Sequence, residues 1–435
     1  MSKLDIRKQI STRKYKITNK FFYWIYRTVM KIVGKKYHAH FNIVDDINKE
    51  KGSCFVLFNH LSRIDHMYVM EACYPKRVNM LAGYSEFFRS HLHFAFKLNN
   101  VLPKKNYGSD FVGTKAIMSI IKQGGSVTFS PEGLATNDGT NKPIVPFTGG
   151  MLKKFGIPVY FVELRGEYLQ NTKHCLDERY GETYATLKKL FSPDDLKNLS
   201  VEEIDNKINE AFRHDEYKWQ KEKHIKWTTN GRMAHHLHEL LYTCPKCLKE
   251  FTMIGEEDKI YCTNCGNGAT LDEYYDFHKF DDSCVIPDLT TDWVTMERIN
   301  IIKEIRNDDN YRFVEKVKIG MLPNDHYLKN KATSEIVDEG ELIIDHSGVY
   351  FRGKTKEHDI DMTYSDIYTV ITELDSSYFN FYYKGEYYDV FPERPSSIKI
   401  SMLIEEMHRL HVNFYKNFPW NDYMYEMDNK GEKND

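Results

Sequence analysis

The chain has 435 residues, a formal net charge of −3 and a hydrophobic content of 41%. This length suffices for two or three domains with cores of their own, and the composition is that of a globular protein. Residues 1 to 36 carry eleven Lys or Arg against the single acid Asp5, so the amino terminus is a basic arm despite the small net charge.

The basic segment, residues 1 to 36, has the periodicity of an amphipathic helix. Its basic residues share one face, and the opposite face is apolar, with Phe21, Phe22, Ile25, Val29, Ile32 and Val33. Such a helix can lie in a membrane interface, and packing of the apolar face on the protein itself is an equal alternative. Arg27 and Lys31 interrupt the apolar run, and we find no signal sequence, so we expect a cytoplasmic protein, peripheral at the inner face of the membrane.

An apolar run over residues 54 to 58 predicts a buried strand that delivers Asn59 and His60, and Asp65 follows five residues after the histidine. A histidine can take a proton from an alcohol near neutral pH while a carboxylate on its other ring nitrogen fixes its tautomer. No Gly-x-Ser-x-Gly nucleophile is present, which favours direct base catalysis on a substrate hydroxyl. Alternatively, His60 caps the strand and Asp65 caps the next helix.

Strands and helices alternate up to about residue 166, which predicts a mixed, mainly parallel α/β sheet. The predicted strands after the first lie near 78 to 83, 100 to 103, 127 to 129 and 157 to 162. Two of them are followed by further polar groups, Lys104 with Lys105 and Glu132 with Gly133. Glycine lets a ligand approach the backbone and lysines suit a phosphate, although both pairs also fit an ordinary turn or a solvated edge.

These blocks together resemble the glycerolipid acyltransferase family, which includes the lysophosphatidate acyltransferases. The first block, Asn-His-x-Ser-x-x-Asp, matches residues 59 to 65 with Asn59, His60, Ser62, Arg63 and Asp65. The third block is similar to residues 129 to 135, and the fourth to Pro146-Phe147 through Pro158-Val159. The order of the blocks over residues 50 to 165 makes the match specific.

The resemblance implies transfer of an acyl chain from acyl-carrier protein or acyl-CoA to the hydroxyl of a lysolipid, 1-acylglycerol 3-phosphate being the first choice. It implies His60 as general base, oriented by Asp65. The substrate-binding residues that follow from it are Asn59, Ser62, Arg63, Lys104, Lys105, Glu132 and Gly133. Lys105 and Ala135 occupy the positions where the family has arginines that bind the acceptor. A lysine offers phosphate only a point charge, whereas an arginine can donate two hydrogen bonds to it.

Two Cys-x-x-Cys pairs fourteen residues apart, Cys244 with Cys247 and Cys262 with Cys265, have the spacing of a zinc ribbon. Four thiolates close a tetrahedral site, so we assign bound Zn²⁺ a structural role. Acidic residues flank the pairs, and this composition argues against a nucleic-acid partner.

Short strands with turns and a final helix fill the carboxyl-terminal part, which resembles a PH-like barrel with a capping helix. The predicted layout is a basic segment (1 to 36), an acyltransferase domain with a mostly helical extension over 167 to 240 (37 to 240), the zinc ribbon (241 to 275), a linker and helix (276 to 309), the PH-like domain (310 to 418) and a disordered tail (419 to 435). A non-catalytic protein that binds membrane lipids or acts as a scaffold is the alternative to an enzyme.

Overall fold

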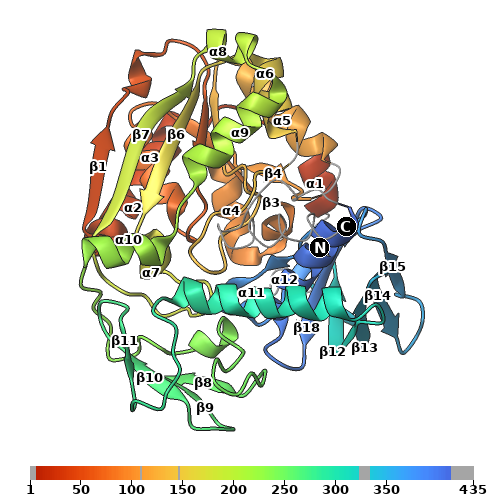
Figure 1. Ribbon diagram of the computed structural model, residues 1–435. Helices are drawn as coiled ribbons and strands as arrows, with labels where there is room; N and C mark the ends of the chain where they lie inside the picture. Colours follow the sequence, from red (N-terminus) through yellow and green to blue (C-terminus); the bar gives the residue numbers. More distant parts are fainter. Residues whose placement is uncertain (1–5, 108–109, 146, 323–333, 413–435) are drawn as a thin grey trace.

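The computed structural model describes residues 6–107, 110–145, 147–322 and 334–412. Pro146 of the fourth block and the predicted tail lie outside the described residues. The described chain forms three sheets (Figure 1), and helix α11 (Thr290–Asn307) connects the four-stranded sheet to the carboxyl-terminal seven-stranded sheet along the chain.

The large sheet has seven strands in the order β1-β7-β6-β2-β5-β3-β4. They are β1 (Ala39–Ile43), β7 (Thr183–Phe191), β6 (Val159–Arg165), β2 (Phe55–Phe58), β5 (Ser126–Phe129), β3 (Val78–Gly83) and β4 (Leu102–Lys104). The five strands from β6 to β4 are parallel, and β7 is antiparallel to β6. The predicted mixed, mainly parallel sheet is confirmed.

Strand β2 is buried on both faces, which is why its sequence is a continuous apolar run. Val56 packs in the core on the side of α3 (Asp65–Cys73), whereas Phe55 and Leu57 pack in the core formed with α5 (Phe111–Lys122), α6 (Thr148–Phe155) and α9 (Val201–Phe212). The residues that follow β2 are therefore held by a strand that is buried over most of its length.

The prediction that residues 167 to 240 are mostly helical is wrong in part, because β7 spans Thr183–Phe191. The segment Thr-Tyr-Ala-Thr-Leu alternates between buried and half-buried side chains and is rich in strand-forming residues, so a period of two prevails. The predicted helix starts at Ser192 and Ser200 are confirmed as capping boxes of α8 (Pro193–Asn198) and α9. Two short helices, α7 (Glu167–Gln170) and α10 (Glu216–Lys223), complete this region.

The two smaller sheets are antiparallel. The first contains β8 (Met253–Glu256), β9 (Lys259–Cys262), β10 (Gly268–Leu271) and β11 (Phe277–Lys279). The second is a seven-stranded half-barrel of β12 (Arg312–Met321), β13 (Glu335–Asp345), β14 (Gly348–Gly353), β15 (Ile360–Met362), β16 (Ile371–Thr372), β17 (Phe379–Tyr383) and β18 (Glu386–Pro392). Helix α12 (Ser397–His411) follows it and is buried over most of its length.

Buried ion pairs join the half-barrel to the rest of the chain. Arg298 of α11 contacts Glu405 and Glu406 of α12, at 2.8 and 3.0 Å. Lys142, from the loop after β5, lies 3.4 Å from Glu405. All four side chains are at most 6% exposed, so the half-barrel is fixed against the α/β sheet rather than tethered to it.

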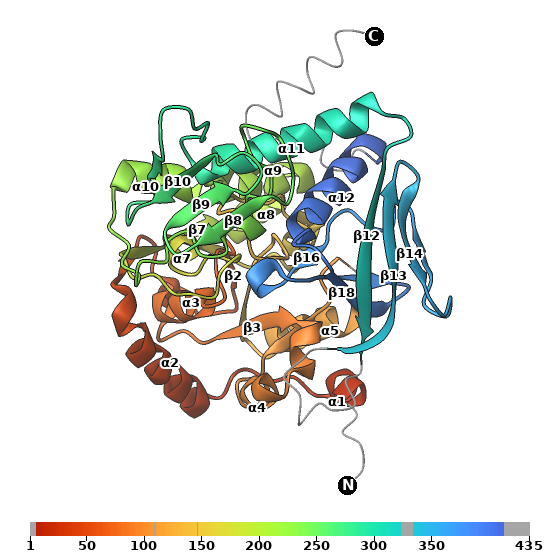
Figure 2. The same cartoon turned by 90° about the horizontal axis from the view of Figure 1, so that it is seen from below.

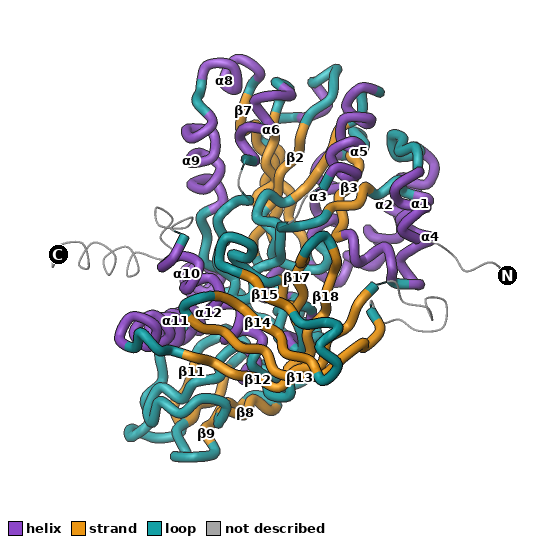
Figure 3. Tube along the Cα trace, turned by 90° about the vertical axis from the view of Figure 1, so that its right-hand side faces the viewer, coloured by secondary structure: helices purple, strands orange, loops and turns teal. Residues whose placement is uncertain are grey.

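Helices α1 (Ile6–Thr12), α2 (Lys20–Gly34) and α4 (Ser90–Leu98) lie together along one side of the molecule (Figures 2 and 3). The inner face of α2 carries the buried Tyr23 together with Arg27, which pairs with Glu71 at 2.8 Å, and Tyr26, whose hydroxyl lies within hydrogen-bond distance of His66. The predicted apolar face points outward, because Phe21, Ile25, Val29 and Ile32 are between 38% and 63% exposed, and Trp24, which lies beside the basic residues, is 50% exposed. The alternative that the apolar face packs on the protein itself is therefore wrong for these residues.

Candidate active site and zinc site

His60 and Asp65 form a hydrogen-bonded pair where β2 gives way to α3. The Nδ1 atom of His60 lies 2.7 Å from Oδ2 of Asp65. The imidazole is one-third exposed, whereas the carboxylate is only 2% exposed. In this geometry the N–H at Nδ1 of His60 donates to the carboxylate, so Nε2 is the basic ring nitrogen that a ligand can reach.

Asp65 is held by the turn that precedes α3. Its Oδ2 atom also accepts the backbone N–H of Leu61, and Oδ1 accepts the N–H and the hydroxyl of Ser62, at 2.8 to 2.9 Å. As the first residue of α3, its negative charge also faces the positive end of the helix dipole. The carboxylate is thus fixed before any ligand binds.

Glu132 fixes the backbone of His60 from the neighbouring strand. Parallel pairing of β2 with β5 brings the ends of the two strands together, and Oε2 of Glu132 accepts the His60 N–H at 2.9 Å. Oε1 accepts the N–H of Lys142 at 2.9 Å. Burial raises the pKa of Glu132 to about 7 against the effect of these two bonds. The Glu132 side chain therefore fixes the position of His60 through the His60 backbone.

Glycine is required at position 133 by the backbone conformation and by the side chains that lie close to it. It has φ of +77°, and a Cβ atom there would lie 2.8 Å from Val145 and 3.1 Å from the Tyr107 hydroxyl. Tyr107 and Asn106 donate hydrogen bonds to the carbonyl groups of Glu132 and Gly133. Neither of these two residues is a predicted site residue, although they directly follow the two predicted lysines.

A cavity of about 510 Å³ opens at the dyad. Most of its lining is apolar, from β3, α3 and α4 and from Tyr23 and Tyr26 of α2, and its residues include Met70, Val78, Met80, Leu81, Leu92 and Phe96. Of the predicted site residues, His60, Ser62, Arg63, Asp65 and Gly133 line it. Burial lowers the pKa of His66, another lining residue, to about 4, so this second histidine is neutral at pH 7.

Other predicted substrate-binding residues lie away from this cavity. The side-chain amide of Asn59 donates to the carbonyl of Leu164 and accepts from its N–H, and these two bonds fasten β2 to β6. Lys104 lies 3.5 Å from Asp110, and Lys105 donates to the carbonyl of Gly385. Neither lysine is among the described residues that line the cavity.

Arg63 reaches the cavity from the first block, but its guanidinium is partly engaged. It donates to the carbonyl of Leu176 at 3.1 Å and lies 4.0 Å from Glu178. Two cationic residues that the sequence analysis did not single out also line the cavity, Arg89 and Lys173. Both belong to segments outside the recognisable blocks.

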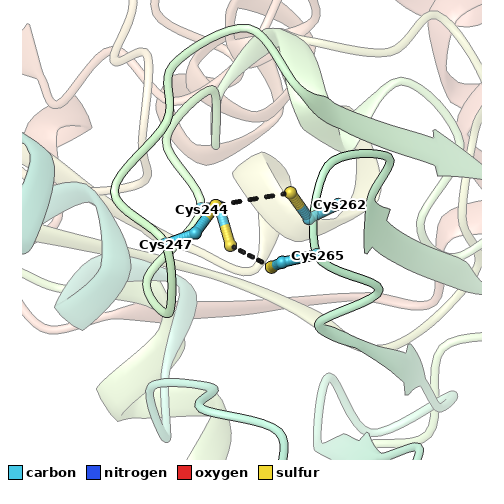
Figure 4. Close-up of side chains that lie close together, drawn as sticks. All are labelled: Cys244, Cys247, Cys262 and Cys265. Carbon is cyan, nitrogen blue, oxygen red and sulfur yellow. Dashed lines mark hydrogen bonds between the residues drawn. The ribbon is translucent and has the colours of Figure 1, made fainter.

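Cys244, Cys247, Cys262 and Cys265 converge in the small antiparallel sheet (Figure 4). Their sulfur atoms lie 3.6 Å apart for Cys244 and Cys265, and 3.8 Å apart for Cys247 and Cys262. All four sulfur atoms lie within 4.8 Å of one another, and tetrahedral zinc with bonds of about 2.3 Å needs sulfurs about 3.8 Å apart, so the cluster has the size of a Zn²⁺ site. Cys265 is exposed, and the other three are buried or half-buried.

Comparison with known proteins gives limited information. No protein-family model and no curated protein matches the chain. The crystal structure of the 1-acyl-sn-glycerophosphate (LPA) acyltransferase PlsC from Thermotoga maritima matches with 16% sequence identity and a TM-score of 0.39. The match covers 48% of this chain and 83% of that one. Similarity at this level establishes no activity for this chain.

Proposed function

We propose that the protein is an O-acyltransferase that moves a fatty acyl chain from a thioester, acyl-CoA or acyl-carrier protein, to the hydroxyl of a lysophospholipid. The observation that carries the proposal is the 2.7 Å contact between His60 and Asp65 at an apolar cavity. A base beside an apolar cavity suits a substrate with a hydroxyl and a long alkyl chain.

In the proposed reaction, Nε2 of His60 takes the proton of the acceptor hydroxyl as its oxygen attacks the thioester carbonyl. The tetrahedral intermediate collapses, the carbon–sulfur bond breaks, and the thiolate takes the proton back from His60. Asp65 stabilises the imidazolium between these two steps. General base catalysis of this kind contributes on the order of 10²- to 10⁴-fold to the rate.

We further propose that the enzyme works on a membrane surface. The exposed side of α2 carries Trp24 beside its outward apolar residues, which suits a membrane interface. Exposed lysines follow at Lys31, Lys35 and Lys36, of which Lys31 pairs with Glu71 and Lys36 with Glu178. The opposite side of the same helix supplies Tyr23 and Tyr26 to the cavity wall, so α2 links the proposed membrane surface with the cavity. Within residues 6–107, 110–145, 147–322 and 334–412, no helix is both long and apolar enough to cross a membrane.

Purified protein with acyl-CoA or acyl-carrier-protein thioesters and a panel of lysolipids tests the proposal. We expect free thiol and diacyl product in equal amounts, with 1-acylglycerol 3-phosphate the first acceptor to examine, and we expect His60→Ala to lower turnover by several powers of ten. Liposome binding without transfer to any lysolipid would instead support the non-catalytic lipid-binding alternative.

A further inference from the structure

Both backbone groups of His60 are bonded to one loop after β5, residues 131 to 142, which we call the support loop. The N–H of His60 donates to Oε2 of Glu132 at 2.9 Å, and the His60 carbonyl accepts the N–H of Thr136 at 2.9 Å. The other carboxylate oxygen of Glu132 accepts the N–H of Lys142, at the far end of the loop. The position of the proposed base therefore depends on the conformation of the support loop.

The half-barrel and the helix that follows it hold the support loop by buried polar contacts. The hydroxyl of Thr372, on β16, donates to Oδ1 of Asn137. The ammonium of Lys142 lies 3.4 Å from both carboxylate oxygens of Glu405, on α12. All four residues are at most 6% exposed, and polar contacts shielded from water in this way are stronger than exposed ones.

A third contact from the half-barrel reaches the loop through Lys173. The N–H of Asp375, in the turn after β16, donates to the carbonyl of Lys173 at 2.8 Å, and the Lys173 ammonium donates to the carbonyl of Ala135 at 3.0 Å. From the other side, the Tyr168 hydroxyl of α7 donates to the carbonyl of Asn137 at 2.8 Å. The half-barrel and the α/β domain thus hold the support loop together.

Glu405 also has partners other than Lys142. Its Oε2 atom accepts from Arg298 of α11 at 2.8 Å, and its Oε1 atom accepts from the Thr369 hydroxyl at 2.8 Å. Removal of the Lys142 ammonium would therefore leave the carboxylate paired, while the support loop would lose its contact with α12. Neither Lys142 nor Glu405 is among the described residues that line the cavity, so neither side chain is placed to touch a substrate.

We propose that Lys142 and Glu405 are positioning residues for His60, and that the half-barrel is a built-in support for the base rather than a separate module for membrane recruitment. The inference rests on the proposed acyltransferase function and adds residues that act on His60 only through the support loop. A misplacement of about 1 Å at a reacting centre can lower a rate on the order of 100-fold, so contacts far from the dyad can control turnover.

Hydrogen exchange of the full-length protein, measured by mass spectrometry, tests this coupling without turnover. Lys142→Met should speed exchange on the order of tenfold in the peptides that contain the His60 and Thr136 amides, because the support loop opens more often. Thr372→Val, which removes the contact with Asn137, should act in the same direction. Lys399→Met is the matched control, since Lys399 is a buried lysine of α12 that pairs with Glu250 and should not affect these peptides.

Kinetics with a short-chain acceptor in solution give the second readout. Lys142→Met should lower kcat on the order of 10- to 100-fold and change KM less than about twofold, because the base is displaced while the cavity wall is intact. Lys399→Met should keep the wild-type kcat, and both variants should bind liposomes like wild type.

Unchanged exchange at His60 and Thr136 in Lys142→Met would overturn the inference. So would a wild-type kcat in this variant, or an equal loss of kcat in Lys142→Met and Lys399→Met, which would assign the loss to general destabilisation. Faster exchange in Lys142→Met, with no acyl transfer by wild type to any acceptor, would reject the acyltransferase function and keep the coupling between the half-barrel and His60.

Discussion

Replacement of Asp65 by asparagine tests the dyad with little change in shape. The carboxylate accepts four hydrogen bonds, two at each oxygen. An amide nitrogen at the Oδ2 position cannot accept from Leu61 or from the Nδ1 proton of His60, so the imidazole must change tautomer and present a protonated Nε2 to the acceptor. Turnover should fall on the order of 10²- to 10⁴-fold, as expected when a general base is lost.

The same substitution should destabilise the fold, because one charge-assisted bond to a buried backbone N–H is lost, at a cost of about 1.5 to 3 kcal/mol. Thiol release from the thioester reports turnover, and urea unfolding reports stability. Asp215→Asn is the matched control, since the Asp215 carboxylate caps α10 by accepting the N–H groups of Tyr217 and Lys218 and lies outside the cavity. Wild-type turnover in a folded Asp65→Asn variant would refute the proposed role of the His60–Asp65 pair in catalysis.

Three further predictions concern other parts of the chain. Metal analysis should find one Zn²⁺ per chain, and Cys244→Ser should lose it and lower the thermal unfolding temperature. The double variant Trp24→Asp with Ile32→Asp should bind anionic liposomes at least tenfold more weakly in flotation assays, whereas Val201→Asp, on an exposed site of α9, should bind normally. Burial raises the pKa of Glu132 from 4.5 to about 7, so the protonated carboxyl stabilises the fold below pH 4.5 and this stabilisation is lost as the pH rises through 7. Urea unfolding should therefore show that the difference in unfolding free energy between wild type and Glu132→Gln shrinks by about 2 kcal/mol from pH 5 to pH 8.

The dyad could be predicted because it is local. Only four residues, which form one turn, lie between His60 and Asp65, so the contact depends only on where β2 ends and α3 begins. Glu132 was predictable for a different reason, since neighbouring parallel strands end at the same edge of a sheet. Even so, the sequence did not indicate that Glu132 acts on the backbone of His60 rather than on a ligand.

Other features depended on contacts that no local pattern encodes. The periodicity of α2 predicts its apolar face, but the inward orientation of the Arg27 side depends on long-range partners, namely Glu71 for Arg27 and His66 for Tyr26. Lys173 lies on an irregular segment after α7, and its place beside Ala135 follows from long-range packing. Strand β7 was missed because its apolar residues are too few to stand out from the helical pattern around it.

The most direct test of the proposed activity is detection of the diacyl product by mass spectrometry after incubation with acyl-CoA or acyl-carrier-protein thioester and 1-acylglycerol 3-phosphate. Wild type should form this product, and His60→Ala, with equal stability and equal liposome binding, should form at least a hundredfold less. Equal product from both proteins, or none from wild type with any lysolipid, would contradict the assignment of His60 as the base of an acyltransferase.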